Sequence, residues 1–489
     1  MASLFCLLTI LTVINHLFTS ALAQLPTTST PSAPLVPSPT LPPLPSPSPP
    51  PPPMPTLTPP TPPNLLMSAE IFPKPFGVGV YSIRIGLGNP PLSQNMVIDT
   101  GSDVTWFECK PCNCDQTPGR LVFDPLNSSS FFVVPCDDAA CNHFGCNNNQ
   151  CQYEVDYMDG SFTKGSLVLE TLTFGRTTLL NMFTGCGHLN QFGVPGNNGL
   201  MGLGGGPLSL PSQLRLRGLA DTFSYCLPPV SIFGSPGWLN FSLPGAVLPA
   251  KTAWIPLLRN SKMQTFYSVE LSGLGIGDMR LPIPPNSFTT TKKGFGGVII
   301  DSGTTYTHLP TPVYEVFRNA YVAKTVNLPR PSFVNSFFDT CYNLSGLESV
   351  QVPNVSFFFS AGPILTLKRI NILVKEEYVF GDQSIFCLAF VPINDTKFII
   401  GNTQLAGIQT TFDPAAGYMG FGPSTCGTPE NSPHCHGHWP ARSIALENSP
   451  NPLLLCERCD GEEADGDGER AHTCDCDELP VVLQPDGQK

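Results

Sequence analysis

Two hexapeptides in this chain of 489 residues are near copies of each other: Val97-Ile98-Asp99-Thr100-Gly101-Ser102 and Ile299-Ile300-Asp301-Ser302-Gly303-Thr304. Each reads apolar-apolar-Asp-Thr/Ser-Gly-Ser/Thr, and the two aspartates lie 202 positions apart, the length of a lobe-sized domain. One copy alone indicates only a turn, because Asp-Ser-Gly is ordinary turn chemistry. Two copies spaced across a duplicated chain predict two carboxyl groups that face each other.

Such a pair has a specific chemistry. Two carboxyl groups about 3 Å apart cannot both ionise, so they share one proton and titrate as a unit. The ionised partner accepts a proton from a water molecule, while the protonated partner donates to the carbonyl oxygen of a peptide bond. The apolar residues before each aspartate fit a strand, and the residues after it fit a tight turn whose amides and hydroxyls bond the carboxylate. The pattern therefore predicts peptide-bond hydrolysis.

Further motifs follow in an order that resembles the pepsin-like aspartic proteases. Trp106 lies a few residues beyond the first turn, and Tyr157-Met158-Asp159-Gly160-Ser161 resembles the flap hairpin of that family. Apolar-apolar-Gly elements recur at Gly199–Leu203 and Phe398–Asn402, and Gly417–Phe421 is similar to the terminal strand. The resemblance implies a mostly β, bilobal fold with an active-site cleft between two β lobes.

The resemblance also implies roles for individual residues. Asp99 and Asp301 match the catalytic dyad, and Tyr157 matches the flap tyrosine that closes over substrate. Trp106 matches the tryptophan of the first lobe, and Met158 stands where the family usually has glycine, so we expect it to alter the flap. The remaining active-site positions are the support residues Thr100, Gly101, Ser102, Ser302, Gly303 and Thr304, of which Ser102 and Thr304 match the hydroxyls beside the dyad, and Thr100 and Ser302 match a hydroxyl grip between the lobes. The family implies no cofactor and no metal.

The cysteines narrow the family further. Twelve of the eighteen cysteines lie between Cys109 and Cys426, and seven of these lie between Cys109 and Cys151, a density that predicts disulfides in a secreted chain. Their array resembles the nepenthesin-type plant branch, as do the phrases Glu170–Gly175, Gly185–Gly187 and Gly206–Leu214. Spacing alone does not give connectivity. The resemblance implies the pairs Cys109–Cys112, Cys114–Cys186, Cys136–Cys151, Cys141–Cys146, Cys226–Cys426 and Cys341–Cys387.

A zinc site at Cys109-x-x-Cys112-x-Cys114 is an alternative that the spacing leaves open. The intact Asp-Thr-Gly turn and the predicted signal peptide argue against it.

The N-terminal region predicts the compartment. Residues 1–23 are predicted to be a signal peptide, because the apolar run Leu4–Ile14 is too short to span a membrane and leads to the cleavage signature Ala21-Leu22-Ala23. Five Asn-x-Ser/Thr sequons agree with passage through the secretory route. We expect secretion to the apoplast or cell wall rather than delivery to the vacuole. The predicted N-glycosylation sites are Asn127, Asn240, Asn343, Asn354 and Asn394.

Residues 24–70 are predicted to be a Pro-rich linker or pro-region. Proline makes up 19 of the 39 residues from Leu25 to Pro63, which predicts a semi-rigid polyproline II rod. Its Ser-Pro and Thr-Pro repeats resemble the glycosylated modules of plant wall proteins, so a wall tether and a linker without partner both stay open. Only Lys74 is basic between the signal peptide and Tyr81, so a basic, folded propeptide is not evident.

The body of the chain reads as two β lobes. Residues 71–250 are predicted to form the N-terminal lobe, with the Cys-rich insertion and the flap, and residues 251–427 the C-terminal lobe, with the boundary near 245–262. One helix is predicted at Thr311–Thr325, from its early proline and helical apolar spacing. The clearest predicted strands are Tyr81–Leu87, Met96–Ile98, Thr265–Leu271 and Val298–Ile300.

Residues 428–489 have a different composition and are predicted to be a disordered, acidic tail. The segment after Cys426 carries a net charge of −9 out of −12 for the chain, which leaves about −3 on the body. The body therefore lacks the field that nucleic acid or an anionic membrane would need. The tail holds Cys and His residues from which a zinc site can be drawn, although their spacing fits no common zinc module.

Three functions are compatible with these features. The leading hypothesis is a secreted, monomeric aspartic endopeptidase that cleaves protein or peptide substrates at acidic pH. The second is a catalytically weak or inactive pepsin-fold protein that binds or inhibits other proteins in the plant cell wall. The third is a structural wall glycoprotein whose working part is the proline tract. The intact dyad favours the first.

Overall fold

The computed structural model divides into two compact units, Met1–Pro59 and Pro60–Lys489, and only the second contains residues that the structure describes. The described residues are 65–73, 79–113, 121–192, 194, 196–229, 236–246, 251–258, 260, 263–288, 297–332, 337–347, 350–376, 384–423, 426, 462–464 and 470–472. The predicted signal peptide, the proline tract and nearly all of the acidic tail lie outside them, so those predictions stay untested.

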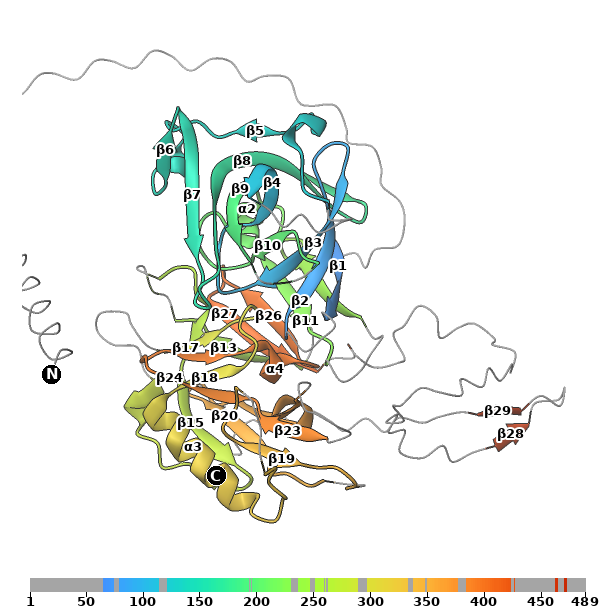
Figure 1. The fold of residues 1–489 in the computed structure, drawn as a ribbon, viewed down its shortest axis with the longest axis vertical. Coiled ribbons are helices and arrows are strands. Elements are labelled where there is room, and N and C mark those ends of the chain that lie inside the picture. Colours follow the sequence, from blue (N-terminus) through green and yellow to red (C-terminus); the bar gives the residue numbers. More distant parts are fainter. Residues whose placement is uncertain are drawn as a thin grey trace, which may run out of the picture. The chain divides into compact units, whose positions relative to one another are not determined.

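A sheet of 15 strands runs through the N-terminal half and into the C-terminal half (Figure 1). Its order is β13-β27-β26-β11-β12-β1-β2-β3-β10-β4-β9-β8-β7-β6, and β5 pairs with β8. Its strands are β1 (Leu65–Pro73), β2 (Tyr81–Leu87), β3 (Leu92–Asp99), β4 (Trp106–Asn113), β5 (Phe132–Val133), β6 (Gly145–Asn147), β7 (Gln150–Asp156), β8 (Phe162–Phe174), β9 (Thr177–Gln191), β10 (Gly199–Gly202), β11 (Thr222–Cys226), β12 (Gly237–Ser242), β13 (Ala253–Pro256), β26 (Gln409–Asp413) and β27 (Tyr418–Gly422).

The C-terminal half contains smaller sheets, ordered β14-β17-β25-β18-β24, β16-β15-β20-β21 and β19-β23-β22, and a hairpin β28-β29 lies in the tail. The strands are β14 (Ser268–Val269), β15 (Leu271–Ile276), β16 (Met279–Arg280), β17 (Val298–Ile300), β18 (Thr307–Pro310), β19 (Cys341–Asn343), β20 (Val355–Phe359), β21 (Ile364–Leu367), β22 (Leu373–Lys375), β23 (Ile385–Leu388), β24 (Phe390–Ile393), β25 (Phe398–Ile400), β28 (Glu462–Ala464) and β29 (Arg470–His472). The helices are α2 (Leu210–Leu216), α3 (Thr311–Lys324) and α4 (Asn402–Leu405), with short 3-10 turns at Pro125–Asn127, Ala139–Cys141, Pro285–Phe288 and Arg369–Asn371.

The two halves share one antiparallel ladder. β11, from the N-terminal half, pairs with β26, from the C-terminal half, so that Phe223 lies opposite Phe412. The rings of these residues stack 4.7 Å apart, and Tyr267 packs 4.5 Å from Phe412. The architecture confirms the predicted mostly β, bilobal, pepsin-like fold.

Three of the predicted elements agree with the structure. β2 and β17 have the predicted bounds, and α3 ends one residue before the predicted end. Pro312 in the first turn presets the backbone for a helix. The helix buries Phe317, whose ring lies 4.6 Å from that of Phe390 on β24.

Three predicted boundaries differ from the structure. The strand predicted at Met96–Ile98 is longer and forms β3, Leu92–Asp99. The segment Thr265–Leu271 is not one strand: β14 begins at Ser268, and the residues before it bond to a glycine loop of the other half. β1 begins at Leu65, six residues before the predicted start of the lobe, because Met67 and Ile71 are buried in the core. The other lobe limits stay predictions.

Two predicted disulfides are present, and four predicted pairings are wrong. Cys226–Cys426 and Cys341–Cys387 form as implied. In place of Cys109–Cys112 and Cys114–Cys186, the structure pairs Cys109 with Cys186, because β4 and β9 run side by side in parallel register. Cys112 is disulfide-bonded as well, and Cys114 lies outside the described residues. The zinc alternative at Cys109 is therefore wrong.

The two crossed bridges of the insertion also differ from expectation. Cys136 pairs with Cys146 and Cys141 with Cys151, in place of Cys136–Cys151 and Cys141–Cys146. Cys141 and Cys151 are both buried in one small apolar cluster with Leu167, whereas Cys146 is exposed. Cys141 and Cys151 thus pair with each other because both are buried in this cluster, whereas the family pattern implied that each pairs with another cysteine.

Within the described part of the chain, no helix has the length and apolar character needed to cross a membrane.

Candidate active site

Each aspartate of the predicted dyad is placed at the end of a strand by a parallel neighbour. β3 ends at Asp99, and β10 runs beside it with Met201 opposite Ile98 and Gly202 opposite Asp99. In the second half, β17 ends just before Asp301, and β25 runs beside it with Ile400 opposite Ile300. The recurring apolar-apolar-Gly elements are thus the strands that support the two aspartates.

The two Asp turns make equivalent hydrogen bonds. Gly101 N donates to Asp99 Oδ1 over 2.8 Å, and the Ser102 hydroxyl donates to Asp99 Oδ2. Gly303 N donates to Asp301 Oδ1 over 2.8 Å, and Thr304 Oγ1 donates to Asp301 Oδ2 over 2.6 Å. Each carboxyl group is therefore held in orientation by one amide and one hydroxyl of its own turn.

A hydroxyl grip joins the two turns. Thr100 N donates to Ser302 Oγ over 3.0 Å, and Ser302 N donates to Thr100 Oγ1 over 2.9 Å. The hydroxyls continue the exchange, since Thr100 Oγ1 donates to Ile300 O and Ser302 Oγ to Ile98 O. All four bonds are buried, and they fix the spacing of the two strand ends.

The two carboxyl groups lie side by side, since a Cβ built on Gly303 would lie within 3.3 Å of an oxygen of each of them. A Cβ added to Gly101 would lie 2.7 Å from Asp301 Oδ2, and one added to Gly303 would lie 2.2 Å from Asp99 Oδ1. Glycine is therefore required in both turns, because each backbone approaches the carboxylate of the other turn. Asp99 and Asp301 are 5% and 9% exposed. Burial, and then the charge of Asp301, raise the pKa of Asp99 well above its usual range, against opposing hydrogen bonds from Ser102 and Gly101.

The predicted flap is the hairpin of β7 and β8. Its turn closes with hydrogen bonds from Tyr157 N to Ser161 O (2.8 Å) and from Gly160 N to Tyr157 O (3.1 Å). Gly160 has φ +83°, a conformation that side chains disfavour. Met158 is 64% exposed at the tip, so its side chain is directed largely toward solvent.

Tyr157 lies close to the dyad. Trp106 Nε1 donates to the Tyr157 hydroxyl over 2.7 Å. Burial, and then the charge of Asp99, raise the pKa of Tyr157 well above its usual range, so the phenol keeps its proton.

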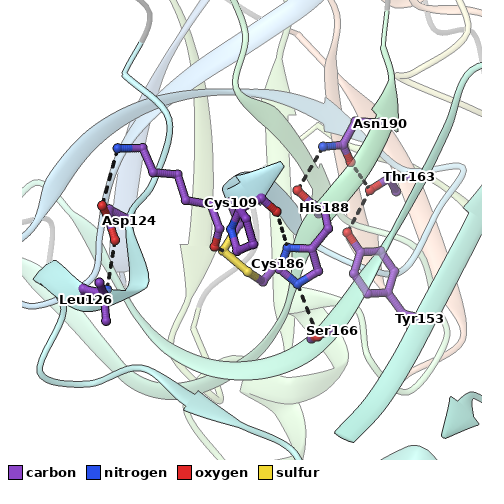
Figure 2. The surroundings of a disulfide bond; sticks show 12 residues. Cys109, Asp124, Leu126, Tyr153, Thr163, Ser166, Cys186, His188 and Asn190 are labelled. Carbon is purple, nitrogen blue, oxygen red and sulfur yellow. Dashed lines mark hydrogen bonds and ion pairs between the residues drawn. A yellow bond between two sulfur atoms is a disulfide. The ribbon is translucent and has the colours of Figure 1, made fainter. Parts of the chain in front are cut away.

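The base of the flap is anchored beside the Cys109–Cys186 disulfide, where Figure 2 shows Tyr153, Thr163 and Asn190 in a row. The Tyr153 hydroxyl bonds with Thr163 Oγ1 over 2.8 Å, and Thr163 Oγ1 donates to Asn190 Oδ1 over 2.7 Å. These bonds tie β7, β8 and β9 together below the flap turn. A hollow of about 270 Å³ lies beside this region, but its lining includes neither aspartate nor either Asp turn.

The structure brings together every predicted active-site residue, and it adds others that the motifs did not identify. Asn402 Nδ2 donates to Ser302 O (3.0 Å) and to Gly79 O (2.7 Å), so it supports the second turn. Asp103 and Thr265 bond each other beside the first turn. The only signal for Asn402 was its place directly after the second apolar-apolar-Gly element, and Thr265 gave none.

Comparison with known proteins identifies relatives along most of the chain. The family model "Xylanase inhibitor N-terminal" matches residues 81–241, and "Xylanase inhibitor C-terminal" matches residues 266–423. The chain is 46% identical over 353 residues to "Protein ASPARTIC PROTEASE IN GUARD CELL 2" of Arabidopsis thaliana, which covers 72% of this chain and 73% of that protein. It is 35% identical over 360 residues to "Aspartic proteinase nepenthesin-1" of Nepenthes gracilis, with 72% and 79% covered.

Solved structures agree in fold. The crystal structure of edgp has a TM-score of 0.60 at 21% identity, covering 73% of this chain and 94% of its own. The crystal structure of basic 7S globulin from soybean has a TM-score of 0.58 at 20% identity, covering 74% and 98%. At these identities the likeness concerns the fold alone.

Proposed function

This chain belongs to the plant branch of the pepsin-like aspartic proteases, and from that premise we propose that it is an active, secreted endopeptidase that hydrolyses protein substrates at acidic pH. One observation carries the proposal: the carboxyl groups of Asp99 and Asp301 lie side by side, and each is oriented by an amide and a hydroxyl of its own turn. A binding protein has no need of this arrangement.

In the proposed mechanism the two carboxyl groups act as one acid–base unit. The ionised carboxylate takes a proton from a water molecule, whose oxygen forms a bond to the carbonyl carbon of the substrate. The protonated partner gives its proton to the carbonyl oxygen, so the tetrahedral diol forms without net charge. When the C–N bond breaks, the pair gives its proton to the amine nitrogen and takes one from a hydroxyl of the diol as the carbonyl re-forms, so the pair again shares one proton.

Acidic pH is expected because this unit must keep one proton. Burial and the neighbouring carboxylate raise the pKa of Asp99, so the singly protonated pair persists above the pH at which an exposed aspartate ionises. Activity fades once this shared proton is lost. The flap supports the reaction by placing Tyr157 near the dyad, where closure over an extended peptide would exclude water.

Secretion is proposed on separate grounds. The bridges Cys226–Cys426 and Cys341–Cys387 persist in an oxidising compartment, as do those of the Cys-rich insertion. The proline tract is proposed to associate with the cell wall, and the enzyme to act as a monomer.

The test is proteolysis by the purified, secreted protein. Denatured protein substrate is incubated near pH 3–4 with and without a statine-type inhibitor, and the Asp301→Asn variant serves as the matched control. We expect cleavage that the inhibitor and the substitution both abolish. An optimum near pH 8, or cleavage that survives in Asp301→Asn, would contradict the assignment.

A second candidate is a binding or inhibitory protein of the same fold. It is favoured by the matching models, which are described as xylanase inhibitor domains, and by the fold shared with seed globulins. The intact dyad and flap argue against it. If the wild-type protein cleaved nothing but bound a wall enzyme with equal affinity before and after Asp301→Asn, this second function would replace the first.

A further inference from the structure

A third aspartate lies directly after the first Asp turn, and the predicted mechanism does not use it. Gly206 N donates to Asp103 Oδ1 over 2.9 Å, and Thr265 Oγ1 donates to Asp103 Oδ2 over 2.7 Å. Both oxygens of the carboxylate thus have partners, one from each half of the chain. Burial raises the pKa of Asp103 against these two hydrogen bonds.

The glycine loop that receives Asp103 is shaped around its carboxylate and is bonded to the first Asp turn. A Cβ on Gly206 would lie 2.1 Å from Asp103 Oδ2, and one on Gly204 would lie 2.4 Å from Asp103 Oδ1. The loop also returns to the catalytic turn, since Leu203 N donates to Asp99 O (2.7 Å) and Gly204 N donates to Ser102 O (2.8 Å). A displacement of this loop would therefore move the turn that carries Asp99.

On the other side, Thr265 leads to the strand that carries Asp301. Gly205 N donates to Thr265 O (2.8 Å), and the Tyr267 hydroxyl donates to Gly204 O (3.0 Å). Tyr267 O in turn accepts from Ile300 N over 3.0 Å, and Ile300 is the residue before Asp301. The next residues form β14, which pairs with β17. A continuous set of hydrogen bonds thus runs from one Asp turn to the other through Asp103.

We propose that Asp103 is a positioning residue for catalysis: through Thr265 it sets the alignment of Asp99 with Asp301, as a second link beside the hydroxyl grip. The inference rests on the proposed peptidase activity. Misplacing reacting groups by about 1 Å can cost 10²-fold in rate. We therefore expect loss of this link to lower kcat and leave KM nearly unchanged.

The second turn has a reciprocal link of different chemistry. Thr305 follows Thr304 as Asp103 follows Ser102, and its hydroxyl donates to Gly79 O over 3.2 Å. A Cβ on Gly79 would lie 1.9 Å from Thr305 Cγ2, so this approach is as close as the one at Asp103. Each turn is thus held by a segment of the opposite half, Gly79 before β2 and Thr265 before β14. Only the first turn uses a carboxylate, which accepts from two donors at once.

The test compares alanine with isosteric variants at both ends of the link. Asp103→Ala removes both acceptors, and we expect kcat to fall about tenfold or more. Asp103→Asn keeps an oxygen for Gly206 N and an amide for the Thr265 hydroxyl, so kcat should return to within about threefold. Thr265→Val should reproduce Asp103→Ala, Thr265→Ser should resemble the wild type, and the double variant Asp103→Ala/Thr265→Val should be no worse than either single change.

Two further readouts separate positioning from general damage. The affinity of a statine-type inhibitor should fall in proportion to kcat/KM across the variants, because it reports transition-state alignment. The control is Asp413→Ala on β26, which removes the acceptor for Ala416 N far from the Asp turns in sequence and should leave kcat unchanged. Equal loss of kcat in Asp103→Asn and Asp103→Ala would overturn the proposal, as would wild-type kcat in Asp103→Ala.

A measurement that needs no activity keeps this inference separate from the proposed function. In Asp103→Ala, hydrogen exchange should accelerate at the Ile300 amide, which lies across the link, and should not accelerate there in Asp413→Ala. Unchanged exchange at Ile300 would overturn the link even in an active enzyme. Faster exchange at Ile300 in Asp103→Ala, together with a wild type that cleaves nothing, would keep the link and reject the enzymatic function.

Discussion

At the scale of single residues, the site depends on a few short contacts that repeat in the two halves. The hydroxyls of Ser102 and Thr304 bond to Oδ2 of the aspartate in their own turn. The amides of Gly101 and Gly303 bond to Oδ1. These bonds orient the carboxyl groups whichever of them carries the proton. Replacing a carboxylate by an amide should therefore change chemistry and leave geometry nearly intact.

Asp99→Asn and Asp301→Asn should each lower kcat by about 10³-fold or more, because the pair then lacks either its base or its proton donor. Cleavage of a quenched peptide near pH 3–4 measures the loss, and circular dichroism checks the fold. Near-full activity in either variant would remove that aspartate from the dyad.

The raised pKa values of Asp99 and Asp103 predict how stability varies with pH. In the folded protein both groups hold protons at pH values where the unfolded chain, with an ordinary pKa of 3.8, has released them. Their contribution to stability is complete below that pH and is lost as pH rises through the folded pKa values. The Tm should therefore fall between pH 4 and 7, and Asp99→Asn should fall less steeply.

Asp339 serves as a control, because its pKa is shifted in the opposite direction and its effect on stability should change with pH in the opposite sense. Burial alone would raise the pKa of Asp339, but hydrogen bonds from Tyr314, Thr340 and Arg318 together lower it. Asp339→Asn should therefore lower the Tm more at pH 7 than at pH 3. Equal slopes of Tm against pH in the wild type and Asp99→Asn would contradict the argument.

Sequence reasoning identified the dyad because its residues form a local repeat, each turn bonding within itself. Asp103 and Thr265 were missed because their contact joins positions 162 residues apart that share no motif. Local pattern predicts local hydrogen bonds, whereas a contact between the halves depends on how the sheets pack.

At the scale of elements, the flap hairpin and the Cys-rich insertion determine what surrounds the dyad. β7 has Cys151 near one end, and the flap tyrosine Tyr157 directly follows its other end. The same strand therefore connects the insertion to the active site. Changes in the insertion that loosen β7 are expected to reach Tyr157.

Tyr157→Phe should lower kcat/KM about tenfold, because Trp106 Nε1 loses its acceptor. Tyr157→Ala should lower it further, since the ring no longer excludes water. Initial rates with one peptide measure both, and Tyr418→Phe, at the exposed end of β27, is the control expected to retain the wild-type rate. An unchanged rate in Tyr157→Ala would exclude the flap tyrosine from the mechanism.

The two bridges of the insertion offer a matched comparison, since both span a sequence separation of 10. The chain-entropy contribution is then equal, and a difference between them reports packing. Replacing Cys141 and Cys151 by alanine should destabilise the insertion by about 1–2 kcal/mol more than replacing Cys136 and Cys146, because the first pair is buried. Thermal unfolding and proteolysis of the insertion measure the difference, and equal losses would contradict it.

The disulfide pattern also shows where family resemblance was insufficient. Cys146 and Cys151 lie opposite each other on β6 and β7. Either of them can therefore pair with a cysteine of the preceding segment, which holds Cys136 and Cys141. The choice between partners depends on which cysteine of that segment enters the apolar cluster with Val134 and Leu167. Neither spacing nor resemblance contains that information. The strands with clear apolar runs, such as β2 and β17, were predictable from local pattern.

At the scale of the whole molecule, strand β1 shows that the first described residues are part of the folded body. It pairs with β12 and β2, and it buries Met67 and Ile71. The composition of residues 24–70 suggested a linker because the proline tract dominates that range. The last six residues of the range belong to the fold.

Deleting residues 24–63 should leave secretion and Tm nearly unchanged, whereas deleting residues 24–73 should cost at least about 4 kcal/mol, from two buried side chains and two lost strand pairings. Secretion level and thermal unfolding distinguish the two variants. Equal stability of both would show that β1 is dispensable.

The ladder between β11 and β26, together with Cys226–Cys426, has a consequence for a chain that is cut. A single cut of the backbone between β12 and β13 would divide the protein into two chains. The hydrogen bonds between β11 and β26 and the Cys226–Cys426 disulfide would still hold these two chains together. Either half produced alone would present an unpaired strand to solvent and should self-associate. The lobes of this protein are therefore halves of one folding unit, and neither is suited to exist as an independent module.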